Sequence, residues 1–246
     1  VMLVGMMSVG ASAVNASDFT DADEIVNKDA VSTMTALGII NGKEDGSYFD
    51  PTGNVTRAEM AKMLCVAING GVDPVLGVKD TPTFTDIKGT WAESYIEYCA
   101  ANGIIAGRGN NKFDPTGTVS ATEAAKMLLG VLGYSAEKSG LVGNDWAINT
   151  NVLANQNGLY KKLANLNANT LLTRDNAAQM IYNALDANMV ELNAAGNYTT
   201  SQYSYTGTES VVTGTERVWV VKIKDSSVND AIKALDGSVY NSRDRK

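Results

Sequence analysis

The chain has 246 residues, a formal net charge of −7 and no histidine. An acidic chain does not offer the basic surface that nucleic acid or an anionic membrane needs, so neither is an expected partner. The absence of histidine excludes histidine-based catalytic triads and metal sites built on imidazole. With 44% hydrophobic and 19% charged residues, the composition predicts a packed core rather than a disordered chain.

The first segment, Val1 to Ala13, is apolar, then rich in small residues, and ends in an Ala-x-Ala pattern. This pattern is typical of the second half of a secretory signal peptide, with cleavage expected after Ala13 or Ala16. The run is too short to span a bilayer, and a short buried helix is the alternative. Because no basic segment precedes it, we expect residues 1–16 to be a signal peptide remnant, and the mature chain to be secreted without a membrane span.

Residues 19–70 form the first of three repeated copies. Apolar residues at helical spacing end at Gly38, which predicts a first helix and its C-terminal stop. Thr56, with Glu59 three places further on, is a capping pair that predicts the start of a second helix.

The same landmarks return in the same order within residues 84–134. Gly38 recurs as Gly103, a step of 103 − 38 = 65, and Thr56 recurs as Ser120, a step of 120 − 56 = 64. Two landmarks with nearly the same offset indicate an internal repeat, and such a repeat decides the architecture.

A third, partial copy covers residues 146–187. Helical periodicity predicts helices from Asn151 to Asn157 and from Arg174 to Asp186. Thr173 takes the capping position, but Asn176 replaces the glutamate, and the Phe-Asp-Pro turn of the first two copies is missing.

The two cysteines occupy repeat positions that large apolar residues fill elsewhere, since Cys65 aligns with Leu129 and Cys99 with Met34. Free cysteine packs as a small hydrophobe, so buried core thiols are expected. A disulfide between them stays open as the alternative.

From Asn188 onward the composition changes to alternating Thr, Tyr, Ser and Val, which predicts strands between Tyr198 and Lys224. A few strands alone form a marginal fold. We therefore expect residues 197–246 to be a β-rich segment that begins a further domain.

The ordered motifs of the three copies resemble those of the S-layer homology (SLH) domain family. That family shows Phe-x-Asp, a tryptophan in the first helix, Gly-Ile-Ile-x-Gly, Asp-Gly-x-Phe-x-Pro, and Thr-Arg-Ala-Glu at the start of the second helix. The first copy has no tryptophan, the second has Trp91 but Ala121 in place of arginine, and the third has Trp146 and Arg174. The resemblance covers about residues 19–187.

The resemblance implies a mainly α fold, with three helix–loop–helix repeats in a pseudo-threefold arrangement around a central three-helix bundle, before the β-rich segment. It also implies a non-catalytic cell-wall anchor, whose grooves between repeats bind secondary cell wall polysaccharide, often through the carboxylate of a pyruvylated sugar. The expected location is the cell wall or S-layer at the bacterial surface. Polysaccharide, peptidoglycan and other S-layer subunits are the expected partners.

Arg57 and Arg174 are the candidate anion contacts. The first turn of a helix carries unpaired N–H groups and a partial positive charge, and a guanidinium beside it suits a carboxylate. The alternative is that these stretches only cap helices. Ala121 interrupts the pattern and puts the groove of the second copy in doubt.

Each remaining candidate also has a structural alternative. Trp91 and Trp146 could stack on sugar faces or pack in the core, while Gly42 and Gly107 could admit the ligand or serve turn geometry. No catalytic residue, metal site or cofactor is expected. The candidate ligand-binding residues are Arg57, Arg174, Thr56, Thr173, Glu59, Gly42, Gly107, Trp91 and Trp146.

An enzyme is the competing class, because paired carboxylates could hydrolyse glycosides. The available carboxylates, however, sit at repeated cap and turn positions, and a catalytic pair is needed once rather than once per copy. These carboxylates are Asp21, Asp86, Glu59 and Glu123. Two alternatives stay open: an anchor for a surface enzyme whose catalytic domain lies beyond residue 246, and a peptidoglycan-binding adhesin.

Overall fold

The computed structural model describes residues 15–71, 73–163, 166–167, 169–200, 202–206 and 209–216. Most of the expected signal remnant, and the part of the expected β-rich segment after residue 216, lie outside these residues.

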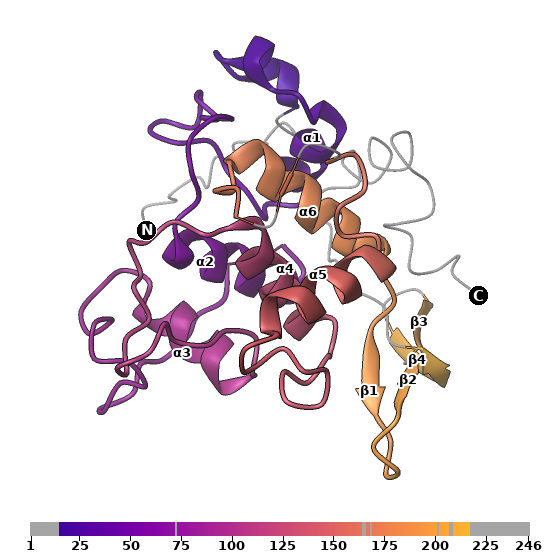
Figure 1. Cartoon of the computed structure of the whole chain (residues 1–246). Helices are drawn as coiled ribbons and strands as arrows, with labels where there is room; N and C mark the ends of the chain where they lie inside the picture. The colour runs from indigo at the N-terminus through magenta and orange to yellow at the C-terminus, as the bar shows by residue number, and fades with distance from the viewer. Residues whose placement is uncertain are drawn as a thin grey trace, which may run out of the picture.

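The described chain is mainly helical, as the sequence predicts, and its helices come in three successive pairs (Figure 1). Two short 3₁₀ turns, Ala16–Asp18 and Ala22–Glu24, precede them. The helix expected from Asn151 in fact begins five residues earlier. The six α-helices are α1 (Lys28–Ala36), α2 (Arg57–Ile68), α3 (Glu93–Ala101), α4 (Ala121–Val131), α5 (Trp146–Gln156) and α6 (Arg174–Asp186).

The second helix of each copy begins at the expected cap. Thr56 Oγ1 accepts a hydrogen bond from the N–H of Glu59, and the Glu59 carboxylate accepts one from the N–H of Thr56. Ser120 starts α4 with the same reciprocal pair. In α6, Thr173 accepts from the third residue of the helix. These bonds are local, so sequence alone predicts them well.

The helices pack across the copies. The first helix of each copy packs against the second helix of the copy before it, α3 on α2 and α5 on α4, and α1 closes the circle by packing on α6. Helix α4 also contacts both α2 and α6. A two-helix repeat buries too little surface alone, so stacking between copies supplies the shared core.

A ring of three backbone hydrogen bonds holds the centre of this circle. Val55 donates its N–H to Leu172 O (2.9 Å), Leu172 donates to Val119 O (2.8 Å), and Val119 donates to Val55 O (2.9 Å). All three side chains are fully buried. Each residue directly precedes the cap of α2, α4 or α6, so the ring places the starts of these three helices around one pseudo-threefold axis.

The aspartate of each Phe-x-Asp motif holds a turn within its own copy. Asp21 accepts the backbone N–H groups of Phe49 (2.9 Å) and Asp50 (2.7 Å), and Asp86 does the same for the corresponding pair in the second copy. These carboxylates therefore have a structural task.

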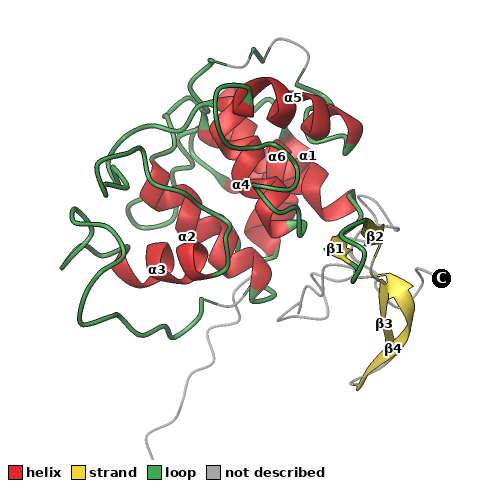
Figure 2. Cartoon of the chain, turned by 60° about the horizontal axis from the view of Figure 1, so that its bottom comes forward, coloured by secondary structure: helices red, strands yellow, loops and turns green. Residues whose placement is uncertain are grey.

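Four strands follow the helices and lie to one side of the helical body in both views (Figures 1 and 2). They form two antiparallel pairs, β1 with β2 and β3 with β4. The first pair is attached to the second copy, because Val190 donates to Leu132 O (2.7 Å) and the Tyr198 hydroxyl accepts from the N–H of Ser135 (2.9 Å). The strands are β1 (Val190–Leu192), β2 (Tyr198–Thr200), β3 (Gln202–Thr206) and β4 (Glu209–Glu216).

Cys65 on α2 and Cys99 on α3 are both buried and free, which confirms the expected core thiols. Their Sγ atoms lie 3.3 Å apart, at the contact between the first and second copies.

Candidate functional site

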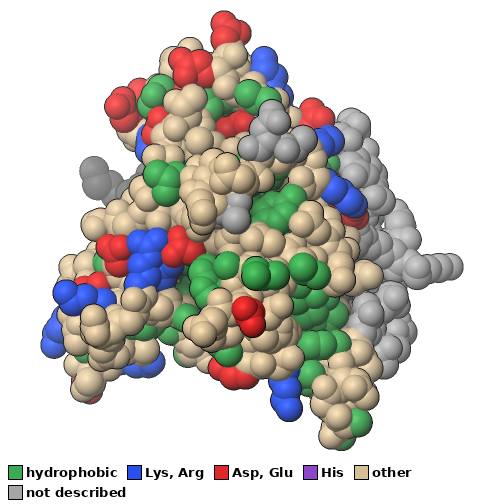
Figure 3. Space-filling view, viewed as in Figure 1, with side chains coloured by type: hydrophobic (Ala, Val, Ile, Leu, Met, Phe, Trp, Pro, Cys, Tyr) green, Lys and Arg blue, Asp and Glu red, His purple; other side chains and the backbone are tan. Residues whose placement is uncertain are grey.

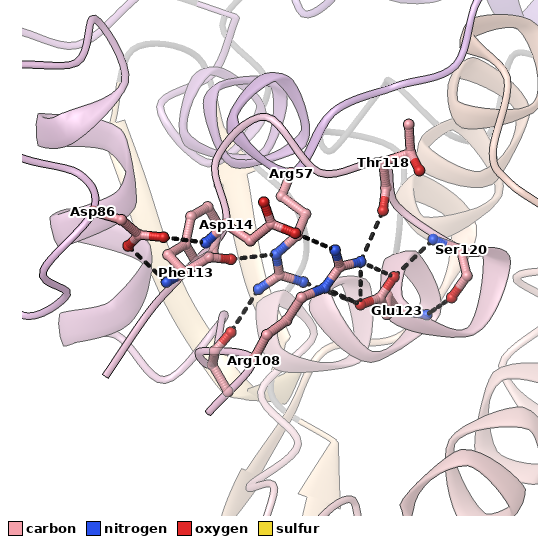
Figure 4. A network of polar contacts seen from close by, with 9 residues as sticks. Arg57, Asp86, Arg108, Phe113, Asp114, Thr118, Ser120 and Glu123 are labelled. Atoms are coloured by element: carbon pink, nitrogen blue, oxygen red, sulfur yellow. Dashed lines mark hydrogen bonds and ion pairs between the residues drawn. The ribbon is translucent and has the colours of Figure 1, made fainter. Parts of the chain in front are cut away.

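Arg57 is a buried bridge between the first and second copies (Figure 4). It is the first residue of α2, and only 3% of it is exposed. Its Nε donates to Phe113 O (2.8 Å), its Nη2 donates to Ala106 O (2.7 Å), and its guanidinium lies 4.4 Å from the centre of the Phe113 ring.

Arg174 repeats this arrangement between the third copy and the first. Its Nε donates to Phe49 O (2.8 Å) and its Nη2 to Asn41 O (2.9 Å). Burial lowers the pKa of Arg57 to about 10 and also lowers the pKa of Arg174, so both guanidinium groups stay charged at neutral pH.

The expectation of unpaired N–H groups at the start of α2 is wrong. The N–H groups of Arg57 and Ala58 donate to Gly117 O (2.8 Å) and Pro115 O (3.0 Å) of the second copy. Thr56 Oγ1 takes the next N–H group. Because the neighbouring copy satisfies these donors, side chains must provide any contact with an anion.

Ala121 affects a different place from the one expected. Its N–H donates to Thr170 O (2.9 Å), so the start of α4 faces the third copy. The contact between the second and third copies is therefore the one that lacks a bridging arginine. In α6, Gln179 stands where α2 and α4 carry a lysine, and it donates to Asn183, which in turn donates to Leu159 O (3.0 Å). In the third copy, the amide side chains of Gln179 and Asn183 thus take the place of the charged lysine.

Two of the cavities correspond in the arginine, glutamate, lysine and tryptophan that line them. We call the first, of about 530 Å³, the Trp146 groove, lined among others by Arg57, Ala106, Arg108, Glu123, Lys126 and Trp146. We call the second, of about 170 Å³, the Trp91 groove, lined among others by Arg174, Asn41, Glu59, Lys62, Asp73 and Trp91.

Each groove collects residues from all three copies. The arginine comes from one copy, the glutamate and lysine from the next, and the tryptophan from the one after that. Sequence reasoning missed Lys62 and Lys126, although 62 + 64 = 126 repeats the offset of the caps. Each lysine follows its glutamate by three residues, which places both on one helix face.

The Trp146 groove has a positive surface. Arg108 Nη2 donates to both carboxylate oxygens of Glu123 (2.8 and 2.9 Å), and its Nη1 pairs with Asp114 (2.6 Å). Burial acts to raise the pKa of Glu123, but the Ser120 N–H and Arg108 outweigh it and hold that pKa below its usual value. Figure 3 shows basic side chains bordered by acidic ones, beside apolar surface.

Lys126 lines the same groove, with its Nζ 5.2 Å from the centre of the Trp146 ring. Among the described residues it forms no ion pair. Burial lowers its pKa. The charge of Glu137 acts against this shift without forming an ion pair, so the partly desolvated ammonium is suited to receive an anionic group.

Neither tryptophan is a core residue. Trp91 is 60% exposed and Trp146 is half-buried, and each lines its groove. Both rings therefore present surface to a ligand.

The two candidate glycines are explained by packing within their own loops. A Cβ at Gly107 would lie 2.6 Å from Lys112 O and 2.8 Å from the Phe84 ring, and one at Gly42 would clash with the carbonyl of Gly46. Gly107 also lines the Trp146 groove, whereas Gly42 only adjoins Asn41 of the other.

The remaining candidate residues, two threonines and one glutamate, form hydrogen bonds that cap helices. Thr56 and Thr173 cap helices, and Glu59 both caps α2 and lines the Trp91 groove. Within the described part of the chain, no cluster of three or more Cys, Asp or Glu side chains could hold a metal ion, and no helix is long and apolar enough to cross a membrane.

A ring of helical repeats with grooves between the copies defines the class of this module. Residues 18–61 and 83–125 match the model of the S-layer homology domain. The first two copies are therefore S-layer homology domains, and this domain implies anchoring at the bacterial cell surface. The third copy lies outside the matched residues.

The chain is also similar to parts of several longer proteins. An S-layer protein of Bacillus licheniformis is 30% identical over 113 residues, 46% of this chain and 12% of that protein. Exoglucanase XynX of Acetivibrio thermocellus is 28% identical over 156 residues, 59% of this chain and 14% of that protein. Endo-1,4-beta-xylanase A of Thermoanaerobacterium saccharolyticum is 30% identical over 149 residues, 56% of this chain and 12% of that protein. The chain thus spans a small part of these relatives.

Proposed function

We propose that this module is a non-catalytic anchor that binds wall polysaccharide in the Trp146 and Trp91 grooves. The observation that carries the proposal is the Trp146 groove, where a tryptophan ring, a lysine that forms no ion pair among the described residues, and two arginines border one cavity of about 530 Å³. Aromatic rings provide apolar area for a sugar face, and the cations suit a carboxylate such as that of a pyruvylated sugar.

The candidate residues then have two kinds of task. Trp146, Trp91 and Lys126 contact the ligand directly, since their side chains lie at the groove surfaces. Arg57 and Arg174 mainly hold neighbouring copies together and contribute their charge from the groove wall.

One groove does not suffice for firm anchoring. A hydrogen bond to a charged group contributes about 1.5–3 kcal/mol, whereas micromolar binding needs about 8 kcal/mol. Several contacts in a groove, or two grooves on one polymer, supply the difference.

The carboxylates support a non-catalytic role for these residues. Asp21 and Asp86 accept backbone N–H groups, and Glu59 and Glu123 cap helices, so structure accounts for all four. Because two relatives are named as glycan-degrading enzymes, the alternative is that this module anchors a surface enzyme.

We further propose that residues 19–70, 84–134 and 146–187 are three copies of one domain, of which the third has lost its charged groove. The ring formed by Val55, Val119 and Leu172 supports this. Ala16 is buried, and its N–H donates to Ser32, so signal cleavage after Ala13 would leave this contact in place.

A wall-binding assay tests the anchor. The purified chain is sedimented with isolated bacterial cell walls, either intact or stripped of their non-peptidoglycan polymer. We expect binding to intact walls only, and a loss of at least about tenfold in affinity for Lys126→Ala combined with Trp146→Ala, the equivalent of about 1.4 kcal/mol.

Two exposed side chains outside both grooves provide controls. Ile148→Ala, on the same helix as Trp146, and Lys88→Ala should bind like the unmodified chain. Binding that survives stripping would indicate peptidoglycan as the ligand. Unchanged binding of the double variant would refute the groove assignment.

A further inference from the structure

The two grooves have the same plan, but their lysines differ in environment. Lys62 of the Trp91 groove pairs with Asp73 (3.0 Å). Lys126 of the Trp146 groove forms no ion pair among the described residues: its Nζ lies over the Trp146 ring, and Glu137, which acts on its charge, does not line the groove.

Asp73 belongs to the linker after the first copy. One carboxylate oxygen meets the Lys62 ammonium, and the other accepts a hydrogen bond from the Tyr95 hydroxyl (2.7 Å). Tyr95 lies on α3 beside Trp91, with ring centres 6.3 Å apart. A carboxylate of the chain itself thus lies against the lysine and beside the tryptophan.

At the same repeat offset, 73 + 64 = 137, the linker after the second copy carries Glu137, whose charge acts on Lys126. Among the described residues Glu137 forms no ion pair with Lys126, and it does not line the Trp146 groove. From this linker Val142, which is 46% exposed, and Gly143 line the Trp146 groove, and neither carries charge.

The charges that line the Trp146 groove are Arg57, Arg108, Lys126 and Glu123, a net of 3 − 1 = +2. Those that line the Trp91 groove are Arg174, Lys62, Glu59 and Asp73, a net of 2 − 2 = 0.

The ionisation of the two lysines agrees with this difference. Burial lowers the pKa of Lys126. Burial also acts to lower the pKa of Lys62, but Asp73 and Tyr95 outweigh it and raise that pKa above its usual value.

We propose that Asp73 makes the grooves unequal by acting as an internal carboxylate ligand of the Trp91 groove. A carboxylated saccharide then binds first in the Trp146 groove and enters the Trp91 groove only by displacing Asp73. This inference rests on the proposed binding function. It assigns the acidic sugar to one groove and names Asp73 as the residue that sets the preference.

Trp91 and Trp146 line different grooves, so each groove can be observed separately. The third tryptophan of the chain, Trp219, gives a resonance of its own, which is assigned with Trp219→Phe. The full chain is labelled with 5-fluorotryptophan, and the ¹⁹F resonances are assigned with Trp91→Phe and Trp146→Phe. The probe is a preparation of acidic wall polysaccharide fragments, and the control probe is the same preparation with its carboxylates reduced to alcohols.

We expect the Trp146 resonance to shift at lower fragment concentration than the Trp91 resonance. We define the midpoint of each resonance as the fragment concentration that produces half of its full shift. Asp73→Asn should lower the Trp91 midpoint about three- to fivefold, the range of an exposed ion pair, and leave the Trp146 midpoint unchanged. Val142→Asp should raise the Trp146 midpoint by a similar factor. The reduced fragments should lose these effects.

Asp80→Asn changes the same charge at an exposed place in the same linker, outside both grooves, and should leave both midpoints unchanged. An unchanged Trp91 midpoint in Asp73→Asn, or an equal effect of Asp80→Asn, would overturn the role of Asp73 but leave the proposed binding function intact. If neither resonance moves with any fragment, both the inference and the proposed function fail.

Discussion

At the scale of single residues, the arginine of the repeated motif links two copies, a role that its position in the sequence does not indicate. A residue in the first turn of an exposed helix would ordinarily point into solvent, yet Arg57 and Arg174 are 3% and 4% exposed. Each satisfies two carbonyl groups of another copy. Loss of wall binding in an arginine variant would therefore not by itself identify a ligand contact.

Arg57→Ala should destabilise the fold by about 3–5 kcal/mol, because two buried carbonyl groups would lose their donor and Glu123 would lose a nearby charge. Chemical denaturation followed by circular dichroism measures this. Arg108→Ala is the matched control, since Arg108 lines the same groove with a side chain 35% exposed, and its loss should cost about 1 kcal/mol or less. Equal losses in the two variants would contradict the bridging role of Arg57.

At the scale of helices, the two helices of one sequence copy are not the two that pack most closely against each other. Helix α3 belongs to the second copy by sequence but packs on α2 of the first, and α1 packs on α6 of the third. The reason is that each second helix presents apolar surface that its own short first helix does not cover. This exchange is also what brings Trp91 and Trp146 to grooves of the preceding copies.

The cysteine pair tests the contact between α2 and α3. The interaction with Cys65, followed by burial, raises the pKa of the Cys99 thiol, so the thiolate is disfavoured. We expect neither thiol to react with an aromatic disulfide reagent in the native chain, and both to react within minutes after denaturation. Rapid reaction of the native chain would show that α3 separates from α2. The variant Cys65→Ala, which keeps Cys99 buried, should stay equally unreactive.

At the scale of the whole molecule, stability depends on carboxylates that link parts of the circle. The Ser120 N–H and Arg108 hold the pKa of Glu123 low against the effect of burial, and Lys79 and Thr83 do the same for Glu97. A group whose pKa is lower in the folded state binds fewer protons there than in the unfolded state. Its stabilisation is therefore present above its ordinary pKa and is lost as the pH falls through the folded value.

We accordingly expect the thermal unfolding midpoint to be constant near neutral pH and to fall as the pH drops below about 4.5, the ordinary value for glutamate. Circular dichroism melts across this range measure the effect. Glu123→Gln should melt lower at neutral pH and show a smaller further loss in acid. A midpoint that rises on acidification would contradict this account.

How much could be predicted from the sequence depends on the range of each interaction. The capping pairs act over three residues, so the start of α2 at Arg57 and the bounds of α6 could be predicted without knowledge of the rest of the fold. The start of α5 could not, because its cap residue Asp145 makes no side-chain capping bond and leaves no local pattern. The mainly α class followed from the repeated helix pairs.

The sequence by itself predicted three copies, a hydroxyl cap at the start of each second helix, and buried cysteines, and the structure confirms the caps and the buried cysteines. Only the tertiary structure decided which copies supply each groove. Arg174 and the Phe49 carbonyl are 125 residues apart in the chain, and no local pattern reports such a contact. Lys62 and Lys126 are likewise identical in the repeat pattern. They differ because Asp73 forms an ion pair with Lys62 inside its groove, whereas Glu137, at the same repeat offset, does not line the groove of Lys126.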